Sequence, residues 1–234
     1  MGAIPRRERL IVALDVPTAA EARALVERIG GAASFYKIGL ELFASGAFHG
    51  LAAWLKARGC RVFADLKLHD IPETVRRAVA GLRPSGIDFL TVHAERGVMG
   101  AAVSEKGEIG ILAVTLLTST GPAELAEMGY SGKLEDLVLA RAGAANELGC
   151  DGVIASGLEV SRIKQRFAAK LLAVVPGIRP AGGEAADQKR VVDVAQAFRN
   201  GADYIVVGRP IRDAADPAAA AAQIQRAIES VFPA

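Results

Sequence analysis

The sequence predicts a single (β/α)8 barrel of the α/β class, because short apolar runs alternate with helical segments along all 234 residues. Most of the runs are continuously apolar, as in parallel strands that are covered on both faces. An open doubly wound sheet is the alternative fold. The expected strands cover residues 10–16, 35–40, 61–67, 88–93, 111–118, 151–156, 171–177 and 203–208. No linker-like stretch divides the chain, so we expect one catalytic domain over residues 1–234.

Segments of helical periodicity lie between these runs, and several have sequence signals at their ends. The first opens with Thr18 as a cap, has Glu21 three residues later, and stops at a glycine. The second has Pro72 in its first turn, where the missing N–H is tolerated. The expected helices cover residues 18–30, 71–83, 133–149, 187–201 and 216–232.

Composition and charge exclude several classes of protein. A net charge of +2, without a basic block interleaved with aromatics, argues against a nucleic-acid surface. Cys60 and Cys150 are far apart and each precedes an apolar run, so we expect core thiols rather than a disulfide or a metal site. No run reaches the roughly 20 apolar residues of a membrane span, and the N-terminus lacks the features of a signal peptide. We expect a cytoplasmic protein.

Polar residues stand where the predicted strands end, which is the catalytic face of such barrels. Asp15, Lys37, Asp65 and Lys67 alternate in charge within apolar strands, and Asp70 follows in the next turn. Buried ions occur in pairs, so a charge network that only stabilises the barrel is the alternative interpretation. A stabilising role favours the opposite end of the strands, however. These residues are therefore candidates for catalysis.

The last two expected strands lead into sequences that are typical of phosphate binding. Gly208 and Arg209 follow the eighth strand, where a glycine turn and a guanidinium form an anion cradle. Residues 176–190 are rich in Gly, Ala and Pro, as in a mobile lid, and Arg179 and Gln188 lie near its two ends. A plain turn and a disordered loop are the alternatives at these two positions.

Taken together, these motifs resemble one enzyme family. "DLKLHDIPETV" (65–75) resembles the DxKxxD signature of the orotidine 5′-phosphate decarboxylase family. The resemblance continues in "VALDV", "YKIG", "LTS", "VPGIRP…DQKR" and "GRPI", in the same order, from residue 11 to about 217. It implies a (β/α)8 homodimer that converts orotidine 5′-monophosphate to UMP and carbon dioxide in pyrimidine biosynthesis, without a cofactor or metal.

The resemblance also assigns roles to residues of this sequence. It implies that Lys67 protonates pyrimidine C6, that Asp65 lies beside the leaving carboxylate, and that Lys37 and Asp70 complete the charge network. Asp70 and Thr74 are expected to reach into the partner subunit's site. The expected substrate contacts are Asp15 and Lys37 to the ribose, Thr118 to the pyrimidine, and Arg179, Gln188, Gly208 and Arg209 at the lid and phosphate.

The chain departs from the family pattern after the fourth strand, where "HAERGVMG" places Glu95 and Arg96 in a region that often holds small residues. His69 and His93 also belong to the pattern, and we interpret both as structural hydrogen-bonding groups, because no proposed proton transfer requires them.

Three other functions compete with this interpretation. Sister families that share DxKxxD use magnesium and have a metal-binding glutamate where this chain has Lys37, whose charge would repel the ion. A pentulose-phosphate epimerase needs metal-ligating His and Asp on several strands. A catalytically silent barrel that binds nucleotides would gain nothing from the charged cluster.

Overall fold

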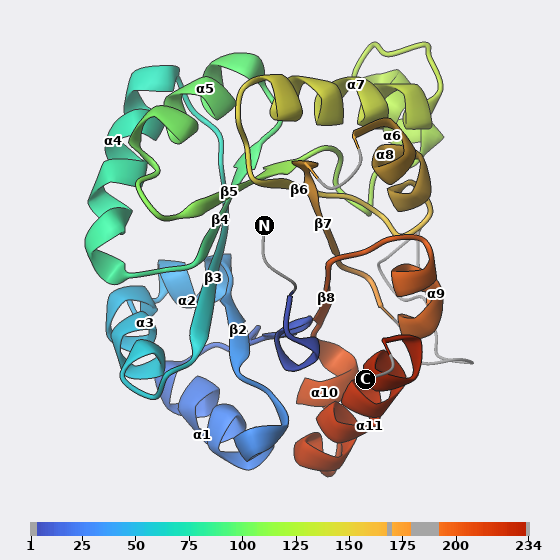
Figure 1. Cartoon of the computed structure of the whole chain (residues 1–234). Coiled ribbons are helices and arrows are strands. Elements are labelled where there is room, and N and C mark those ends of the chain that lie inside the picture. Colours follow the sequence, from blue (N-terminus) through green and yellow to red (C-terminus); the bar gives the residue numbers. More distant parts are fainter. Residues whose placement is uncertain (1–3, 168–169, 179–191, 233–234) are drawn as a thin grey trace.

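A computed structural model describes residues 4–167, 170–178 and 192–232, and its strands form one closed parallel barrel in sequence order (Figure 1). The predicted fold class is therefore confirmed. The doubly wound alternative is wrong, because β1 pairs with β8 and closes the sheet. The strands are β1 (Leu10–Ala13), β2 (Phe35–Ile38), β3 (Arg61–Leu68), β4 (Phe89–His93), β5 (Gly110–Val114), β6 (Gly152–Ile154), β7 (Leu172–Val175) and β8 (Tyr204–Val207).

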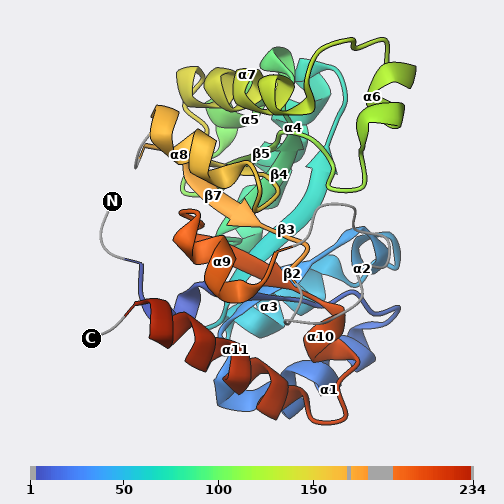
Figure 2. The same ribbon diagram turned by 90° about the vertical axis from the view of Figure 1, so that its right-hand side faces the viewer.

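Helices surround the ring of strands, and Figure 2 shows the barrel from the side, with α6 at one end and the last turns of α11 at the other. The helices are α1 (Ala19–Ile29), α2 (Leu40–Ala44), α3 (Phe48–Lys56), α4 (Pro72–Leu82), α5 (Arg96–Glu105), α6 (Pro122–Glu127), α7 (Leu134–Glu147), α8 (Val160–Phe167), α9 (Val194–Arg199), α10 (Arg209–Arg212) and α11 (Pro217–Val231). Short 3-10 turns are η1 (Arg6–Glu8), η2 (Gly30–Ala32) and η3 (Arg83–Ser85). Within the described ranges, none of the helices is long and apolar enough to cross a membrane.

The predicted start of the first helix is confirmed, because the Thr18 hydroxyl accepts the backbone N–H of Glu21. The helix expected over residues 187–201 is shorter than its periodicity indicates. Asp193 caps α9 by accepting the N–H of Gln196, and Val192 before it pairs with Ile178 in an isolated bridge. The pairing of Val192 holds the chain extended up to the cap. Residues 187–191 lie outside the described residues.

Two apolar cores fill the space on either side of the strands. The larger one lies between the strands and the helices, and the smaller one fills the inside of the barrel. Phe35, Phe63, Phe89 and Tyr204 are buried in this inner core, with ring centroids 5.3–6.2 Å apart in the contacts that join them. Because side chains alternate along a strand, the residue two positions further on faces the same interior.

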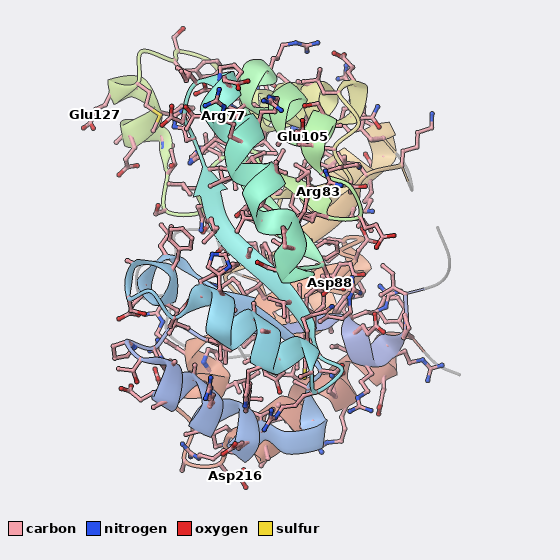
Figure 3. All side chains as sticks on the ribbon, turned by 90° about the vertical axis from the view of Figure 1, so that its left-hand side faces the viewer. Arg77, Arg83, Asp88, Glu105, Glu127 and Asp216 are labelled. Carbon is pink, nitrogen blue, oxygen red and sulfur yellow. The ribbon has the colours of Figure 1, made fainter. Side chains whose placement is uncertain are left out.

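The N-terminal end of the barrel is held by three aspartates in equivalent positions. Each directly precedes an even-numbered strand, accepts a backbone N–H of the preceding odd-numbered strand and pairs with a lysine. Asp88 bonds Val62 N and Lys56, Asp151 bonds Ile111 N and Lys106, and Asp203 bonds Ala173 N and Lys164. Figure 3 shows Asp88 near the start of β3 and Glu127 of α6 toward the opposite end. These contacts join neighbouring strands and so stabilise the barrel.

Candidate active site

The candidate site lies above the inner aromatic core, because side chains two residues apart on a strand face the same side. Lys37 follows Phe35 by two residues, Asp65 follows Phe63, and Asp15 follows Ala13. Each of these polar side chains therefore projects into the C-terminal mouth of the barrel, directly above an apolar neighbour on the same strand. The sequence thus brings groups from β2, β3 and the end of β1 to one place.

The charged side chains form one chain of alternating sign. Lys37 Nζ lies 2.7 Å from Asp15 Oδ1 and 3.5 Å from Asp65 Oδ2. On the other oxygen of the same carboxylate, Asp65 Oδ1 lies 2.8 Å from Lys67 Nζ. The predicted grouping of Asp15, Lys37, Asp65 and Lys67 is therefore present in the structure.

Burial makes this pairing necessary. Lys37 is only 7% exposed. Burial would lower the pKa of the Lys37 ammonium, but Asp65 and Asp15 outweigh it and raise this pKa above its ordinary value. Likewise, burial would raise the pKa of the Asp65 carboxyl, but Lys37 and Lys67 hold it below its ordinary value. Both groups are therefore ionised at neutral pH.

Lys67 has an unusual backbone conformation. It is the one non-glycine residue in the described ranges with a positive φ, at 48°, a conformation that costs free energy for a residue with a side chain. The pairing of β3 with β4 shifts register between Ala64 and Leu68. Strain of this kind gathers at functional sites, where surrounding contacts hold it in place.

A cavity of about 450 Å³ opens beside this charged chain, at the C-terminal ends of the strands. Thr118, Gly208 and Arg209, which follow β5 and β8, also line it. The cavity thus brings the expected pyrimidine contact and the expected phosphate contacts into one space with Lys67. Its other polar lining residues are Asp15, Lys37, Asp65, Lys67 and Arg212.

Asp70 and Thr74 lie apart from this cavity. Asp70 is exposed, its carboxylate accepts the N–H of Ile71, and it makes no ion pair in the part of the chain that the structure describes. Thr74 is exposed in the first turn of α4. Within one chain, Asp70 therefore does not complete the network around Lys67. Arg179 and Gln188 fall outside the described residues.

The two histidines contact each other rather than the cavity. The ring centroids of His69 and His93 lie 4.7 Å apart, and His69 Nε2 lies 2.7 Å from Glu95 Oε1. Burial and the neighbouring His69 lower the pKa of His93. Glu95 directly precedes α5, and Arg96 in the first turn of α5 pairs with Glu147. The residues that depart from the family pattern are thus part of a surface network.

Three residues around the site were missed by sequence reasoning. Thr91 of β4 donates its hydroxyl to Asp65 Oδ1 at 2.9 Å, and its position two residues after Phe89 could have indicated this. Gly39 leaves room for the ion pair, since a Cβ there would lie 2.9 Å from Asp15 Oδ1. Arg212 donates to the backbone oxygen of Asp15 at 2.7 Å.

Over the described ranges, no three His, Cys, Asp or Glu side chains are grouped so as to hold a metal ion.

Comparison with known proteins points to one family. A model of the orotidine 5′-phosphate decarboxylase / HUMPS family matches residues 8–224. The chain is 55% identical over 230 residues to the orotidine 5′-phosphate decarboxylase of Methylococcus capsulatus, covering 98% of this chain and 95% of the relative. It is 50% identical to that of Xanthomonas euvesicatoria, covering 97% and 94%.

Solved structures agree. The crystal structure of orotidine 5′-phosphate decarboxylase from Lactobacillus acidophilus matches with a TM-score of 0.83 at 34% identity, over 97% of this chain and 100% of that one. The structure of the enzyme from Pyrococcus horikoshii matches with a TM-score of 0.76 at 27% identity, over 94% and 99%.

Proposed function

The chain belongs to the orotidine 5′-phosphate decarboxylase / HUMPS family, and we propose that it decarboxylates orotidine 5′-monophosphate to UMP in pyrimidine biosynthesis. The observation that carries this choice within the family is the position of Lys37. Its ammonium lies between Asp15 and Asp65, at 2.7 and 3.5 Å. The magnesium-dependent sister enzymes require a carboxylate ligand at this strand end, and a buried cation would repel the metal.

Decarboxylation needs an ammonium group at the site of bond cleavage. When the bond from C6 to the carboxylate breaks, carbon dioxide leaves and the electron pair stays on C6, in an orbital that the ring delocalises poorly. The positive charge of Lys67 stabilises this pair, and Lys67 Nζ–H then transfers a proton to C6. Lys67 becomes a neutral amine and takes a proton from water, so that one proton is consumed for each UMP formed.

Asp65 supports this step in two ways that act together. Its Oδ1, 2.8 Å from Lys67 Nζ, fixes where the ammonium lies. Its negative charge also lies where the substrate carboxylate is proposed to bind, which would raise the free energy of the bound substrate. Lys37 on the other side keeps Asp65 ionised throughout.

The remaining lining of the cavity supports a role in binding the rest of the substrate. Asp15, Lys37 and Thr118 all line it. Asp15 and Lys37 would hold the ribose hydroxyls, and Thr118 would contact the pyrimidine. Gly208 and Arg209 would bind the phosphate, with Arg179 and Gln188 proposed to close over it. Binding energy from this non-reacting phosphate can be used to organise the charged residues. In this proposal the whole chain is one catalytic domain, which acts in the cytoplasm and needs no cofactor.

A homodimer with shared sites accounts for the outward position of Asp70 and Thr74. Large apolar side chains are exposed nearby, at the adjoining ends of β2 and β3: Leu40 at 54%, Phe43 at 44% and Ile71 at 67%. A two-fold interface over this region would bury them and bring Asp70 toward the Lys67 of the second subunit. The four-residue network of Lys37, Asp65, Lys67 and Asp70 would then be complete only in the dimer.

The proposed reaction is tested by following pyrimidine ultraviolet absorbance when the purified protein is incubated with orotidine 5′-monophosphate. We expect turnover that EDTA does not abolish. Activity that disappears in EDTA and returns with Mg²⁺ would favour the sister families instead. Binding of UMP without any turnover would indicate a silent nucleotide-binding barrel.

The shared site is tested by mixing two inactive variants, Lys67→Ala and Asp70→Ala, and allowing their subunits to exchange. Each mixed dimer has one site with both defects and one intact site, so random pairing should restore about a quarter of the wild-type activity. A mixture that stays at the level of the parents after verified exchange would confine each site to one chain.

A further inference from the structure

The Thr91 hydroxyl connects the strained backbone of β3 to the Asp65 carboxylate, which lies between the ammonium groups of Lys37 and Lys67. Thr91 lies in β4 and is fully buried, at 0% exposed. Its hydroxyl donates to Asp65 Oδ1 at 2.9 Å and accepts the backbone N–H of Lys67 at 3.0 Å. One side chain therefore contacts both residues that the reaction requires, although it does not line the cavity.

The register of the barrel explains why a hydroxyl is needed at this position. Ala64 of β3 pairs with Leu90, and the next pair is Leu68 with Val92. The three residues from 65 to 67 thus lie opposite the single residue Thr91, as in a β-bulge. In a regular ladder the N–H of Lys67 would bond to a backbone carbonyl. Here the Thr91 side chain takes the place of that carbonyl, and it allows Lys67 its positive φ.

The same hydroxyl sets the direction of the Asp65 carboxylate. A threonine has one O–H to donate, and here Asp65 Oδ1 receives it. Lys67 Nζ approaches that oxygen, while Lys37 Nζ faces the other. With the Thr91 bond in place, the carboxylate plane and the position of the Lys67 ammonium are both defined before any substrate binds.

We infer that Thr91 is a positioning residue for the decarboxylation, which fixes the Asp65 carboxylate and the bulged backbone of Lys67 so that the ammonium points at C6. The inference rests on the proposed function. It extends that function to a residue that touches no substrate, and it gives the bulge in β3 a purpose. Catalysis is sensitive to such placement, because a shift of about 1 Å can cost about 100-fold in rate.

The test compares Thr91→Val, which keeps the shape and removes the hydroxyl, with Thr91→Ser, which restores it. For Thr91→Val we expect kcat on orotidine 5′-monophosphate to fall by about tenfold to 100-fold, while KM and the Kd of UMP change by less than about twofold. Thr91→Ser should recover most of kcat. The acid limb of kcat/KM should also move to higher pH in Thr91→Val, because the hydroxyl helps to keep the pKa of Asp65 low.

Thr115→Val is the matched control. Thr115 is equally buried, but its hydroxyl donates to the backbone oxygen of Ile154 and contacts neither Asp65 nor Lys67. We expect Thr115→Val to lose thermal stability and to keep the wild-type kcat and pH profile. If Thr91→Val does not fold, Thr91→Ala against Thr91→Ser makes the same comparison.

The inference is overturned if the folded hydroxyl-free variant keeps wild-type kcat and pH profile. It is also overturned if Thr91→Ser is as slow as Thr91→Val, or if Thr115→Val loses kcat equally. Failure of the proposed function has a separate signature: the wild-type protein itself would then not turn over orotidine 5′-monophosphate.

Discussion

The two ends of β3 carry charged side chains in the same interior row of the barrel but use them differently. At the N-terminal end, the Arg61 guanidinium bonds Glu8 at 2.7 Å and Asp88 at 3.2 Å, and it lies 4.4 Å from the centre of the Phe35 ring. At the C-terminal end, the Lys67 ammonium bonds only the Asp65 carboxylate among the described residues, and Lys67 lines the cavity. The arginine is held by two carboxylates and an aromatic ring, whereas the Lys67 ammonium has donors left for a ligand.

The carboxylates at the two ends of the barrel also differ in the groups that hold them. Asp88, Asp151 and Asp203 each accept a backbone N–H of a neighbouring strand, which anchors them to the sheet. Asp65 instead accepts hydrogen bonds from side chains, those of Lys67 and Thr91. Ion pairs alone therefore do not identify the site. What distinguishes the site is that the hydrogen bonds to Asp65 come from side chains, and that the Lys67 ammonium beside it keeps donors for a ligand in the cavity.

The largest expected effect follows from removing the ammonium group that faces the cavity. Lys67→Ala should lower turnover of orotidine 5′-monophosphate by about 10⁴-fold, because charge stabilisation and proton transfer are both lost. The Kd of UMP, which lacks the reacting carboxylate, should change far less. Steady-state kinetics and calorimetric titration with UMP measure the two quantities. Near-native turnover would contradict the assignment of Lys67.

A smaller effect is expected from adding a methyl group at Gly39, next to the Asp15–Lys37 ion pair. A Cβ on Gly39 would lie 2.9 Å from Asp15 Oδ1 and 3.0 Å from Lys37 Nζ, so Gly39→Ala should displace this ion pair. We expect kcat/KM to fall by about tenfold, with little loss of stability, because both contacts are the ends of side chains. Gly31→Ala is the control, since its Cβ would meet no atom within 4 Å. Equal kinetics in the two variants would show that the Asp15–Lys37 geometry does not limit the reaction.

The smallest effect is a dependence of stability on pH. Burial would raise the pKa of Asp65, but Lys37 and Lys67 hold it below its ordinary value of 3.8. The ionised carboxylate therefore stabilises the fold above that value, and this contribution is lost as pH falls through the lower pKa of the folded protein. Urea unfolding at several pH values between 7 and 3 measures the free energy of unfolding of the wild type and of Asp65→Ala. The difference between the two should stay constant near neutral pH and change against the wild type only at the acidic end. A difference that stays constant down to pH 3 would contradict the lowered pKa of Asp65.

Most of the fold and the charged chain could be predicted from the sequence, because both follow from short periodicities. Continuous apolar runs indicated buried parallel strands, and the polar residues at the ends of these runs indicated that Lys37 and Asp65 lie at the catalytic face of the barrel. The start of α9 could not be predicted, because it depends on the bridge between Val192 and Ile178, which are distant from each other in space until the chain folds. A helical periodicity does not reveal such a contact.

The parts of the site that were missed depend on register and on close contacts. The spacing of Thr91 from Phe89 indicates that Thr91 faces the barrel interior, but no local pattern specifies the bulge that sets it opposite residues 65–67. The aspartates at the other end did leave a signal. Each stands in a Gly-x-Asp sequence, with Gly86, Gly149 and Gly201 at positive φ two residues before the aspartate. Only the structure shows that these repeats join neighbouring strands.

The central claim is that ion pairs at the C-terminal end of the barrel serve chemistry, whereas those at the N-terminal end serve stability. It is tested most directly by measuring kcat and the free energy of unfolding for Asp65→Ala and Asp151→Ala side by side. Each change removes a carboxylate that pairs with a lysine at 2.7–2.8 Å. We predict that Asp65→Ala lowers kcat by about 10³-fold, whereas Asp151→Ala keeps kcat and loses about 2 kcal/mol of stability. A folded Asp151→Ala protein without activity, or an Asp65→Ala protein with wild-type turnover, would contradict the account.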